Sequence, residues 1–280
     1  MRTYLECIPC FFRQALEAAR MVTEDDCKQK AVLDAVALKI PGFPLEATPP
    51  EMGFTIYGAV REITNHGDPY RVVKEESNRR ALTLYPQLKR KVEEAEDPLL
   101  MAVRFAIAGN VIDFGANPDF DLDQELEEIE TRPFAVFDYQ VFKKALEQAD
   151  EVLYLGDNAG EIVFDRLLIE QLSKPVVFVV RGAPVINDAT LNDAQVAGID
   201  QVAKVISSGI AVPGTILRLC SKKFLQHYEK ASVIISKGQG NYETLSEEKR
   251  SIFFLLKAKC PVIARHLEVE VGDIVLKKAG

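Results

Sequence analysis

The chain has 280 residues, of which 48% are hydrophobic and 27% charged, the ordinary mixture of a globular protein that buries a core without disulfide or metal support. Its 34 Lys and Arg against 42 Asp and Glu give a net charge of −8, which argues against nucleic acid or an anionic membrane as a partner. The apolar runs are too short to span a bilayer, and the first residues carry no signal-peptide pattern. We therefore expect a cytoplasmic protein, and the sequence leaves its oligomeric state open.

The first part of the chain carries the three- and four-residue spacing of apolar side chains that predicts helices. The stripe from Phe11 to Ala19 is the first of these patterns. Further helices are predicted over residues 26–40, 52–64, 68 onward with an interruption at Pro86, 97–108 and 124–129. We therefore expect an α-helical bundle or cap domain over residues 1–130.

The second part alternates apolar, β-branched segments with helical ones. Strands are predicted over residues 152–155, 176–180, 201–207, 232–236 and 251–256, and helices over 162–172, 188–196 and 215–230. This alternation indicates βαβ units, so we expect residues 131–280 to form an α/β domain with a doubly wound, mainly parallel, Rossmann-like sheet. Numbered along the chain, these five strands are expected in the usual order of such sheets, 3-2-1-4-5, which places the first strand between the second and the fourth.

Polar loops follow the first, second and fourth predicted strands, and ligands of doubly wound sheets bind at the carboxyl ends of the strands. Asp157, Asn158 and Asp188 offer hard oxygen ligands of the kind that Mg²⁺ or Mn²⁺ prefers. Gly160 precedes a helix whose free N–H groups can face an anion, and Lys237 can place an ammonium beside a phosphate. Together these residues predict a phosphoryl site in one crevice.

Simpler interpretations of the same residues stay open, because an Asp-Asn pair after a strand often forms a turn, and Asn187-Asp188 would also cap a helix. Motifs of other enzyme classes are missing from the sequence: G-x-G-x-x-G, the P-loop and the G-x-S-x-G elbow. Two competing functions remain. One is an S-adenosylmethionine-dependent methyltransferase, and the other is a phosphometabolite-binding protein without turnover.

Three motifs in this order resemble the damage-control phosphatase family, which was first catalogued as a domain of unknown function. They are residues 155–161 (LGDNAGE), 181–190 (RGAPVINDAT) and 236–243 (SKGQGNYE). Residues 108–114 and 259–262 resemble the family too, so the likeness covers nearly the whole chain. The Cys7-Ile-Pro-Cys10 segment is similar to the small stand-alone branch of archaea and other prokaryotes.

The resemblance implies a metal-dependent phosphatase that hydrolyses small phosphate esters: sugar phosphates, nucleotide- or cofactor-related esters, or damaged metabolites. The implied metal is Mn²⁺ or Ni²⁺, with Co²⁺ or Mg²⁺ as alternatives. The metal ligands of the family fall on Asp157, Asn158 and Asp188, and its phosphate-binding lysine falls on Lys237. The patterns of the sugar-phosphate branch and of the branch fused to pantothenate kinase are incomplete here, which leaves the substrate open.

The expected mechanism uses water as the nucleophile. Asp157 or Asp188 would orient or deprotonate the attacking water, and Lys237 with the helix N-terminus would stabilise the charge that develops on phosphate. Three further residues are predicted to contact phosphate or substrate: Asn110, Asp113 and Arg181. A helix cap is an equally good interpretation of Asn110 and Asp113.

Five cysteines and three histidines complete the reactive residues. An odd cysteine count favours reduced thiols, and no histidine has a zinc-binding spacing. Three interpretations of Cys7 and Cys10 compete: partly buried structural thiols, a redox pair, or thiols that assist a metal. We expect the N-terminal segment to fold back over the crevice, which would place these thiols near the substrate and not in a separate zinc site.

Overall fold

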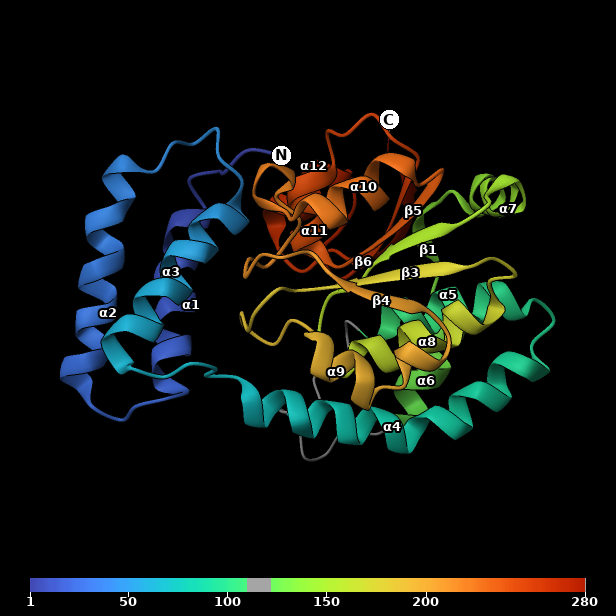
Figure 1. The fold of residues 1–280 in the computed structure, drawn as a ribbon, viewed down its shortest axis with the longest axis horizontal. Helices are drawn as coiled ribbons and strands as arrows, with labels where there is room; N and C mark the ends of the chain where they lie inside the picture. The colour runs from blue at the N-terminus through green and yellow to red at the C-terminus, as the bar shows by residue number, and fades with distance from the viewer. Residues whose placement is uncertain (110–121, 280) are drawn as a thin grey trace.

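A seven-stranded sheet runs through the middle of the larger part of the molecule (Figure 1). The structure is a computed structural model, and it describes residues 1–109 and 122–279. The strand order is β1-β7-β6-β5-β2-β3-β4, and every neighbouring pair is parallel except β6 and β7. The strands are β1 (Phe134–Phe137), β2 (Val152–Leu155), β3 (Val176–Val180), β4 (Lys204–Ser207), β5 (Val233–Lys237), β6 (Ile252–Lys257) and β7 (Ile274–Lys278).

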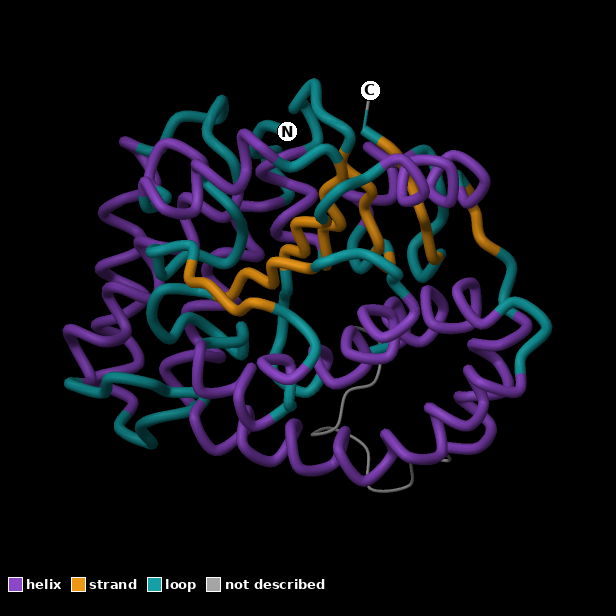
Figure 2. Tube along the Cα trace, turned by 45° about the vertical axis from the view of Figure 1, so that its right-hand side comes forward, coloured by secondary structure: helices purple, strands orange, loops and turns teal. Residues whose placement is uncertain are grey.

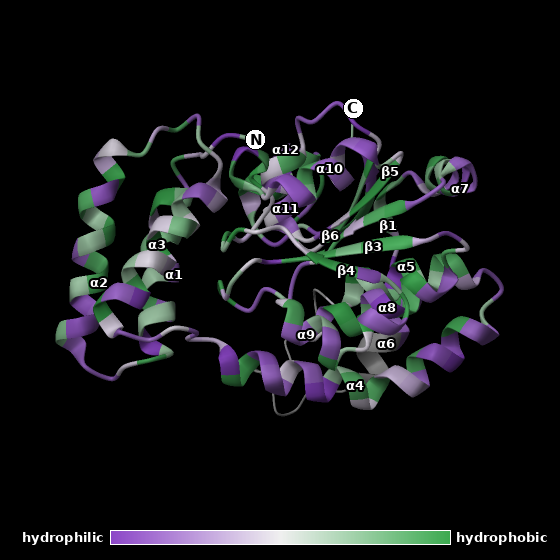
Figure 3. Cartoon of the chain, in the orientation of Figure 1, coloured by the Kyte–Doolittle hydropathy of each residue, from purple (hydrophilic) through white to green (hydrophobic). Residues whose placement is uncertain are grey.

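The central strands are apolar on both faces because helices cover the sheet on both sides. One face packs against α4 (Arg71–Glu94), α5 (Pro98–Ala108), α7 (Tyr139–Gln148), α8 (Glu161–Gln171) and α9 (Leu191–Val196). The other face packs against α10 (Lys222–Lys230), α11 (Gln239–Leu245) and α12 (Pro261–Leu267). Figure 2 shows the orange strands between the purple helices, and Figure 3 shows green, hydrophobic residues along the sheet.

Helices α1 (Cys7–Arg20), α2 (Asp26–Lys39) and α3 (Pro49–Thr64) form a bundle to one side of the sheet (Figure 1). This bundle has its own apolar cluster, which includes Phe11, Val36 and Ile56. Val185, from the loop after β3, is buried in the same cluster. The bundle is thus anchored to a loop at the carboxyl edge of the sheet.

The predicted fold class is confirmed, and so is the predicted order of the five central strands, which appear as β4-β3-β2-β5-β6. Two strands were not predicted. β1 is a short strand at the edge of the sheet, where its side chains alternate between half-buried and exposed, and β7 has only three apolar residues before two lysines. The predicted helix over residues 215–230 divides into a short 3₁₀ turn at Leu217–Leu219 and α10, and α9 begins at Leu191 rather than at residue 188.

Helix α4 also differs from the prediction, because Pro86 does not interrupt it. It is one continuous helix of 24 residues with this proline in its interior. A proline inside a helix loses a backbone hydrogen bond. Burial of Ala81, Leu88 and Val92 against the neighbouring helices offsets that loss. In the described ranges, 1–109 and 122–279, no helix has both the length and the apolar character that crossing a membrane requires.

The predicted division at residue 130 does not coincide with a boundary between hydrophobic cores. Helices α4 and α5 lie before that residue, yet they pack on α8 and share the core of one sheet face. Among the helices that the structure describes, α1, α2 and α3 alone pack around a cluster separate from the two sheet faces. A short helix, α6 (Leu122–Thr131), connects to β1 and corresponds to the helix predicted over 124–129.

Candidate active site

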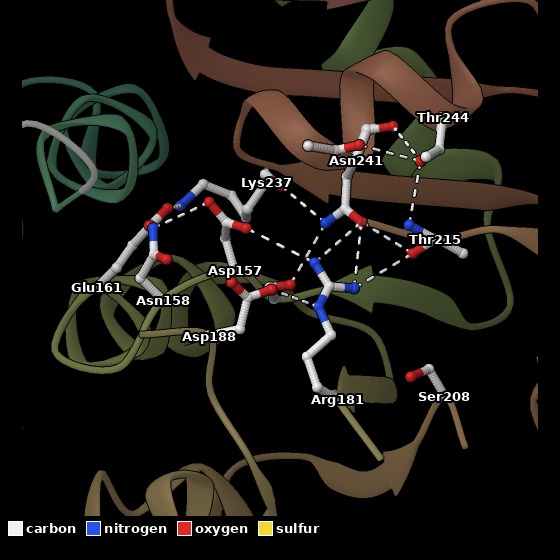
Figure 4. A network of polar contacts seen from close by, with 12 residues as sticks. Asp157, Asn158, Glu161, Arg181, Asp188, Ser208, Thr215, Lys237, Asn241 and Thr244 are labelled. Atoms are coloured by element: carbon white, nitrogen blue, oxygen red, sulfur yellow. Dashed lines mark hydrogen bonds and ion pairs between the residues drawn. The ribbon is translucent and has the colours of Figure 1, made fainter. Parts of the chain in front are cut away.

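The loops after β2 and β3 are joined at the carboxyl edge of the sheet. Ala159 donates its N–H to the carbonyl of Asn187, and Ala189 donates to the carbonyl of Asp157, each at 2.8 Å. A single antiparallel bridge pairs Asn158 with Asp188 between these bonds. The three predicted metal ligands, Asp157, Asn158 and Asp188, are therefore brought together (Figure 4).

Arg181, the residue directly after β3, is the cation that contacts both aspartates of this cluster. Its Nε donates to Oδ2 of Asp188 at 2.5 Å, and its Nη2 lies 3.6 Å from Oδ1 of Asp157. Both Nη atoms donate to Oδ1 of Asn241 at 3.3 Å, and that oxygen also accepts from the hydroxyl of Thr215 at 2.8 Å. Arg181 was predicted to contact phosphate, whereas its guanidinium here is engaged by protein groups from the loops after β2 and β3 and from helix α11 (Gln239–Leu245).

Lys237 does not face the open crevice. Its side chain is completely buried, and its Nζ donates to Oε1 of Glu161 at 2.7 Å, to Oδ1 of Asp165 at 2.5 Å and to the carbonyl of Ala106 at 2.6 Å. An ammonium has three protons, so all of its donors are used. To contact phosphate as predicted, Nζ would have to release one of these acceptors.

The orientation of Lys237 follows from the period of its strand. Side chains of a strand alternate between the two faces of the sheet. Ile235 lies on the face covered by α5 and α8, so Lys237, two residues later, points to the same face. Asn241 completes the connection to the other loops, since its Nδ2 donates to the carbonyl of Lys237 at 2.8 Å.

Glu161 and Asp165 are polar residues of the site that the sequence analysis did not single out. They lie four residues apart on one face of α8, and both are buried. Asp165 also accepts a hydrogen bond from the hydroxyl of Tyr154 at 2.8 Å. The signal that could have revealed them is a pair of carboxylates on the inward face of an otherwise apolar helix, because buried carboxylates require partners.

Burial and mutual repulsion set the protonation behaviour of the cluster. Burial raises the pKa of Asp157 well above its ordinary value, and the nearby charges of Glu161 and Asp188 raise it further against the opposing effect of Arg181. Burial likewise raises the pKa of Asp188, and Arg181 opposes this. Burial acts to lower the pKa of Lys237, but its two carboxylate partners outweigh that effect, so the pKa is raised.

The donor chemistry fits a hard divalent cation held by Asp157, Asn158 and Asp188. Within the described residues, Arg181 contacts Asp157 and Asp188, and Lys237 contacts Glu161 and Asp165, so four carboxylates gather around two cations. Nδ2 of Asn158 lies 3.0 Å from Oδ2 of Asp157 and 2.9 Å from Oε2 of Glu161, so two carboxylates already converge on one donor.

The described side chains contain no group of three or more His, Cys, Asp or Glu arranged to hold a metal ion. The predicted ligand set is compatible with this, because it consists of two carboxylates and one amide. Gly238 leaves space for the carboxylate of Asp157. Its φ is +78°, and a Cβ added there would fall 1.9 Å from Oδ2 of Asp157. Only glycine therefore allows the loop after β5 to approach that carboxylate.

Three predicted site residues remain to be located: Gly160, Asn110 and Asp113. The N–H of Gly160 donates to Oδ1 of Asn78 at 2.7 Å, so it is not available to an anion as predicted. Gly160 instead permits close approach of α4, because an added Cβ would lie 2.9 Å from Cβ of Ser77. Asn110 and Asp113 lie outside the described residues.

Comparisons with known proteins agree with this architecture. The chain is 38% identical to damage-control phosphatase PH1575 of Pyrococcus horikoshii, over 98% of this chain and 97% of the relative, and 32% identical to a damage-control phosphatase of Archaeoglobus fulgidus, over 97% of both chains. It is also 38% identical to protein MJ0202 of Methanocaldococcus jannaschii, over 98% of this chain and 94% of the relative.

A crystal structure of the DUF89 family protein PH1575 matches the fold with a TM-score of 0.93 and 34% identity, over the full length of both chains. The names of two relatives support a phosphatase role for this chain. A model of the damage-control phosphatase ARMT1-like domain matches residues 3–275. The resemblance seen in the three motifs is thus confirmed, and the chain belongs to the damage-control phosphatase ARMT1-like family.

Proposed function

We propose that this protein is a metal-dependent phosphomonoester hydrolase, and that Asp157, Asn158 and Asp188 hold the metal. The observation that carries the proposal is the joining of the loops after β2 and β3, which brings the oxygen donors of Asp157, Asn158 and Asp188 together at the carboxyl edge of the sheet. The metal we propose is Mn²⁺ or Ni²⁺, with Co²⁺ or Mg²⁺ as alternatives. The oxygen donors favour Mn²⁺ and Mg²⁺, whereas Ni²⁺ and Co²⁺ are implied by the family. The substrates are small phosphate esters, including sugar phosphates and nucleotide- or cofactor-related esters.

The residues of the candidate site have different roles in this mechanism. A bound divalent metal supplies charge neutralisation at phosphate and lowers the pKa of a water. Arg181 fixes the orientation of the Asp188 carboxylate through the bond from Nε. Asp157 orients the attacking water and accepts its proton on Oδ2, the oxygen that does not face Arg181. Lys237 acts through Glu161, whose other oxygen accepts from Asn158 and so fixes the amide beside Asp157.

The test is phosphate release from a panel of sugar phosphates, nucleotides and phosphopantetheine, with each of the four metals in turn. We expect turnover with at least one metal, no turnover after chelation, and an unchanged circular dichroism spectrum in the chelated protein. Asp157→Asn should lose both turnover and calorimetric metal binding. The exposed Asp200, in a turn before β4, provides the matched control Asp200→Asn, which should behave as wild type.

The outcomes separate the alternatives. Full activity in chelated protein would overturn the metal requirement. Binding of esters without phosphate release under any metal would favour the non-catalytic binding protein. Calorimetric binding of S-adenosylmethionine together with absent phosphatase activity would favour the methyltransferase.

A further inference from the structure

A cavity of about 320 Å³ lies at the carboxyl edge of the sheet, beside the loops of the candidate active site. Its floor comes from the loops that follow β3, β5 and β6, through Ile186, Gln239 and Cys260. Helix α1 contributes Cys7 and Cys10 to its wall. A cavity of this size can bury a small organic molecule. The mechanism proposed above uses none of these side chains.

Three of the five cysteines line this cavity, although Cys260 is far from Cys7 and Cys10 in the sequence. Cys7 and Cys10 lie in the first turn of α1, and Cys260 is the residue before α12. Cys7 and Cys260 pack against the same hydrophobic cluster. All three are only partly buried, whereas Cys27 is exposed and Cys220 is buried elsewhere, so the latter two serve as internal controls.

The helical spacing of Cys7 and Cys10 is compatible with the Cα separation of a disulfide. Residues three apart in an α-helix have Cα atoms about 5 Å apart, from the helix radius and rise. Disulfides span Cα distances of about 4.4–6.8 Å. The first turn of α1 can therefore be cross-linked with little movement of the backbone.

The two thiols are not equivalent. Sγ of Cys10 accepts hydrogen bonds from Nη2 of Arg13 and from Nε2 of Gln14, both at 3.5 Å. The hydrogen bond from Arg13 holds Sγ of Cys10 at a position partly exposed to solvent, where an incoming disulfide can reach it. Cys7 lies deeper, where burial raises its pKa and Glu243, Cys260 and Cys10 add to that effect. Cys10 is thus suited to attack first and Cys7 to react second.

We propose that Cys10 and Cys7 form a dithiol exchange site, and that the cavity beside them takes a low-molecular-weight disulfide as the oxidant. The Cys10 thiolate attacks one sulfur of that disulfide and expels the first thiolate, which forms a mixed disulfide on Cys10. The Cys7 thiolate then attacks Sγ of Cys10, which forms the Cys7–Cys10 bond and expels the second thiolate. The protein loses two electrons and two protons, and the small disulfide becomes two thiols.

The test uses full-length, reduced protein and oxidised glutathione as the probe. We expect the wild-type chain to lose two hydrogen masses and peptide mapping to find a Cys7–Cys10 bond that dithiothreitol reverses. Cys7→Ser should stop at the mixed disulfide and gain one glutathione on Cys10. Cys27→Ser should oxidise like wild type, and Arg13→Gln should slow the first step while circular dichroism stays unchanged.

Three results would overturn the proposal. The first is the absence of any disulfide in wild-type protein at excess oxidised glutathione. The second is a bond from Cys7 to Cys260 in place of Cys10, and the third is glutathione attached to Cys27 alone. The proposal concerns thiols that the phosphatase mechanism does not use, so its failure would leave the proposed function intact.

Discussion

Arg181 and Asp188 form a buried ion pair: Nε of the arginine donates to Oδ2 of the aspartate at 2.5 Å, and the two residues are only 3% and 2% exposed (Figure 4). Asp188 is thus both a predicted metal ligand and the counter-charge of a buried cation. Loss of one partner from a buried pair leaves an uncompensated charge, which costs about 3–5 kcal/mol. Stability and activity are therefore linked at this residue.

We expect Asp188→Ala to lower the free energy of unfolding by about 3–5 kcal/mol, because Arg181 loses its shortest hydrogen bond in a buried position. Asp188→Asn should cost less, since an amide oxygen can still accept from Nε. Urea unfolding followed by circular dichroism measures both, with Asp200→Asn as the surface control. A wild-type unfolding midpoint in Asp188→Ala would show that the pair does not contribute as we argue.

Lys237→Met should also destabilise the fold by about 3–5 kcal/mol, because Glu161 and Asp165 would remain buried without their cation. Changing Asp165→Asn in the same chain should recover part of that loss, since one buried charge is removed. Denaturant titrations of the single and double variants test this. A Lys237→Met protein of normal stability that has lost inhibition by free phosphate would instead assign Nζ to phosphate binding.

Gly238→Ala should lower phosphatase activity sharply, because its Cβ would displace the Asp157 carboxylate and φ at +78° strains any L side chain. The matched control is Gly58→Ala in α3, where a Cβ meets nothing within 4 Å. That change should stabilise the protein by about 0.4–1 kcal/mol. Phosphate release and thermal unfolding of the two variants give the comparison. Equal activity in both would mean that Asp157 tolerates displacement.

Glu243 gives a prediction about pH. Burial raises its pKa from 4.5 to about 7, against the opposing effects of Gln239 and the N-terminal amine. The folded protein therefore binds this proton more tightly than the unfolded chain does, and stability should fall as pH rises from about 4.5 to 7. The full effect of such a shift is on the order of 3 kcal/mol.

Glu243→Gln should remove this pH dependence and make the protein more stable than wild type at pH values above the folded pKa. Urea unfolding across the acid-to-neutral range measures it, and Glu229→Gln on the exposed side of α10 is the control. If wild type and Glu243→Gln change in parallel with pH, the carboxyl is ionised throughout.

Much of the site was predictable from the sequence because of one physical rule. The carboxyl ends of parallel strands meet at a single edge, so the loops after β2 and β3 had to lie together once the strands were recognised. The proximity of Asp157, Asn158 and Asp188 follows directly from that rule, and the backbone bonds show that their loops are joined. Their role as metal ligands stays a prediction. The order of the five central strands was predictable for the same reason.

The partners of each side chain were decided only by the tertiary structure. The sequence by itself determined the edge of the sheet to which Lys237 belongs, but the acceptors of its Nζ come from α8 and from Ala106 in α5, 131 residues earlier in the chain. Asn78 reaches the N–H of Gly160 from α4 in the same way. Periodicity along a chain shows which face a side chain takes, whereas burial with a specific partner depends on how distant helices pack against that face.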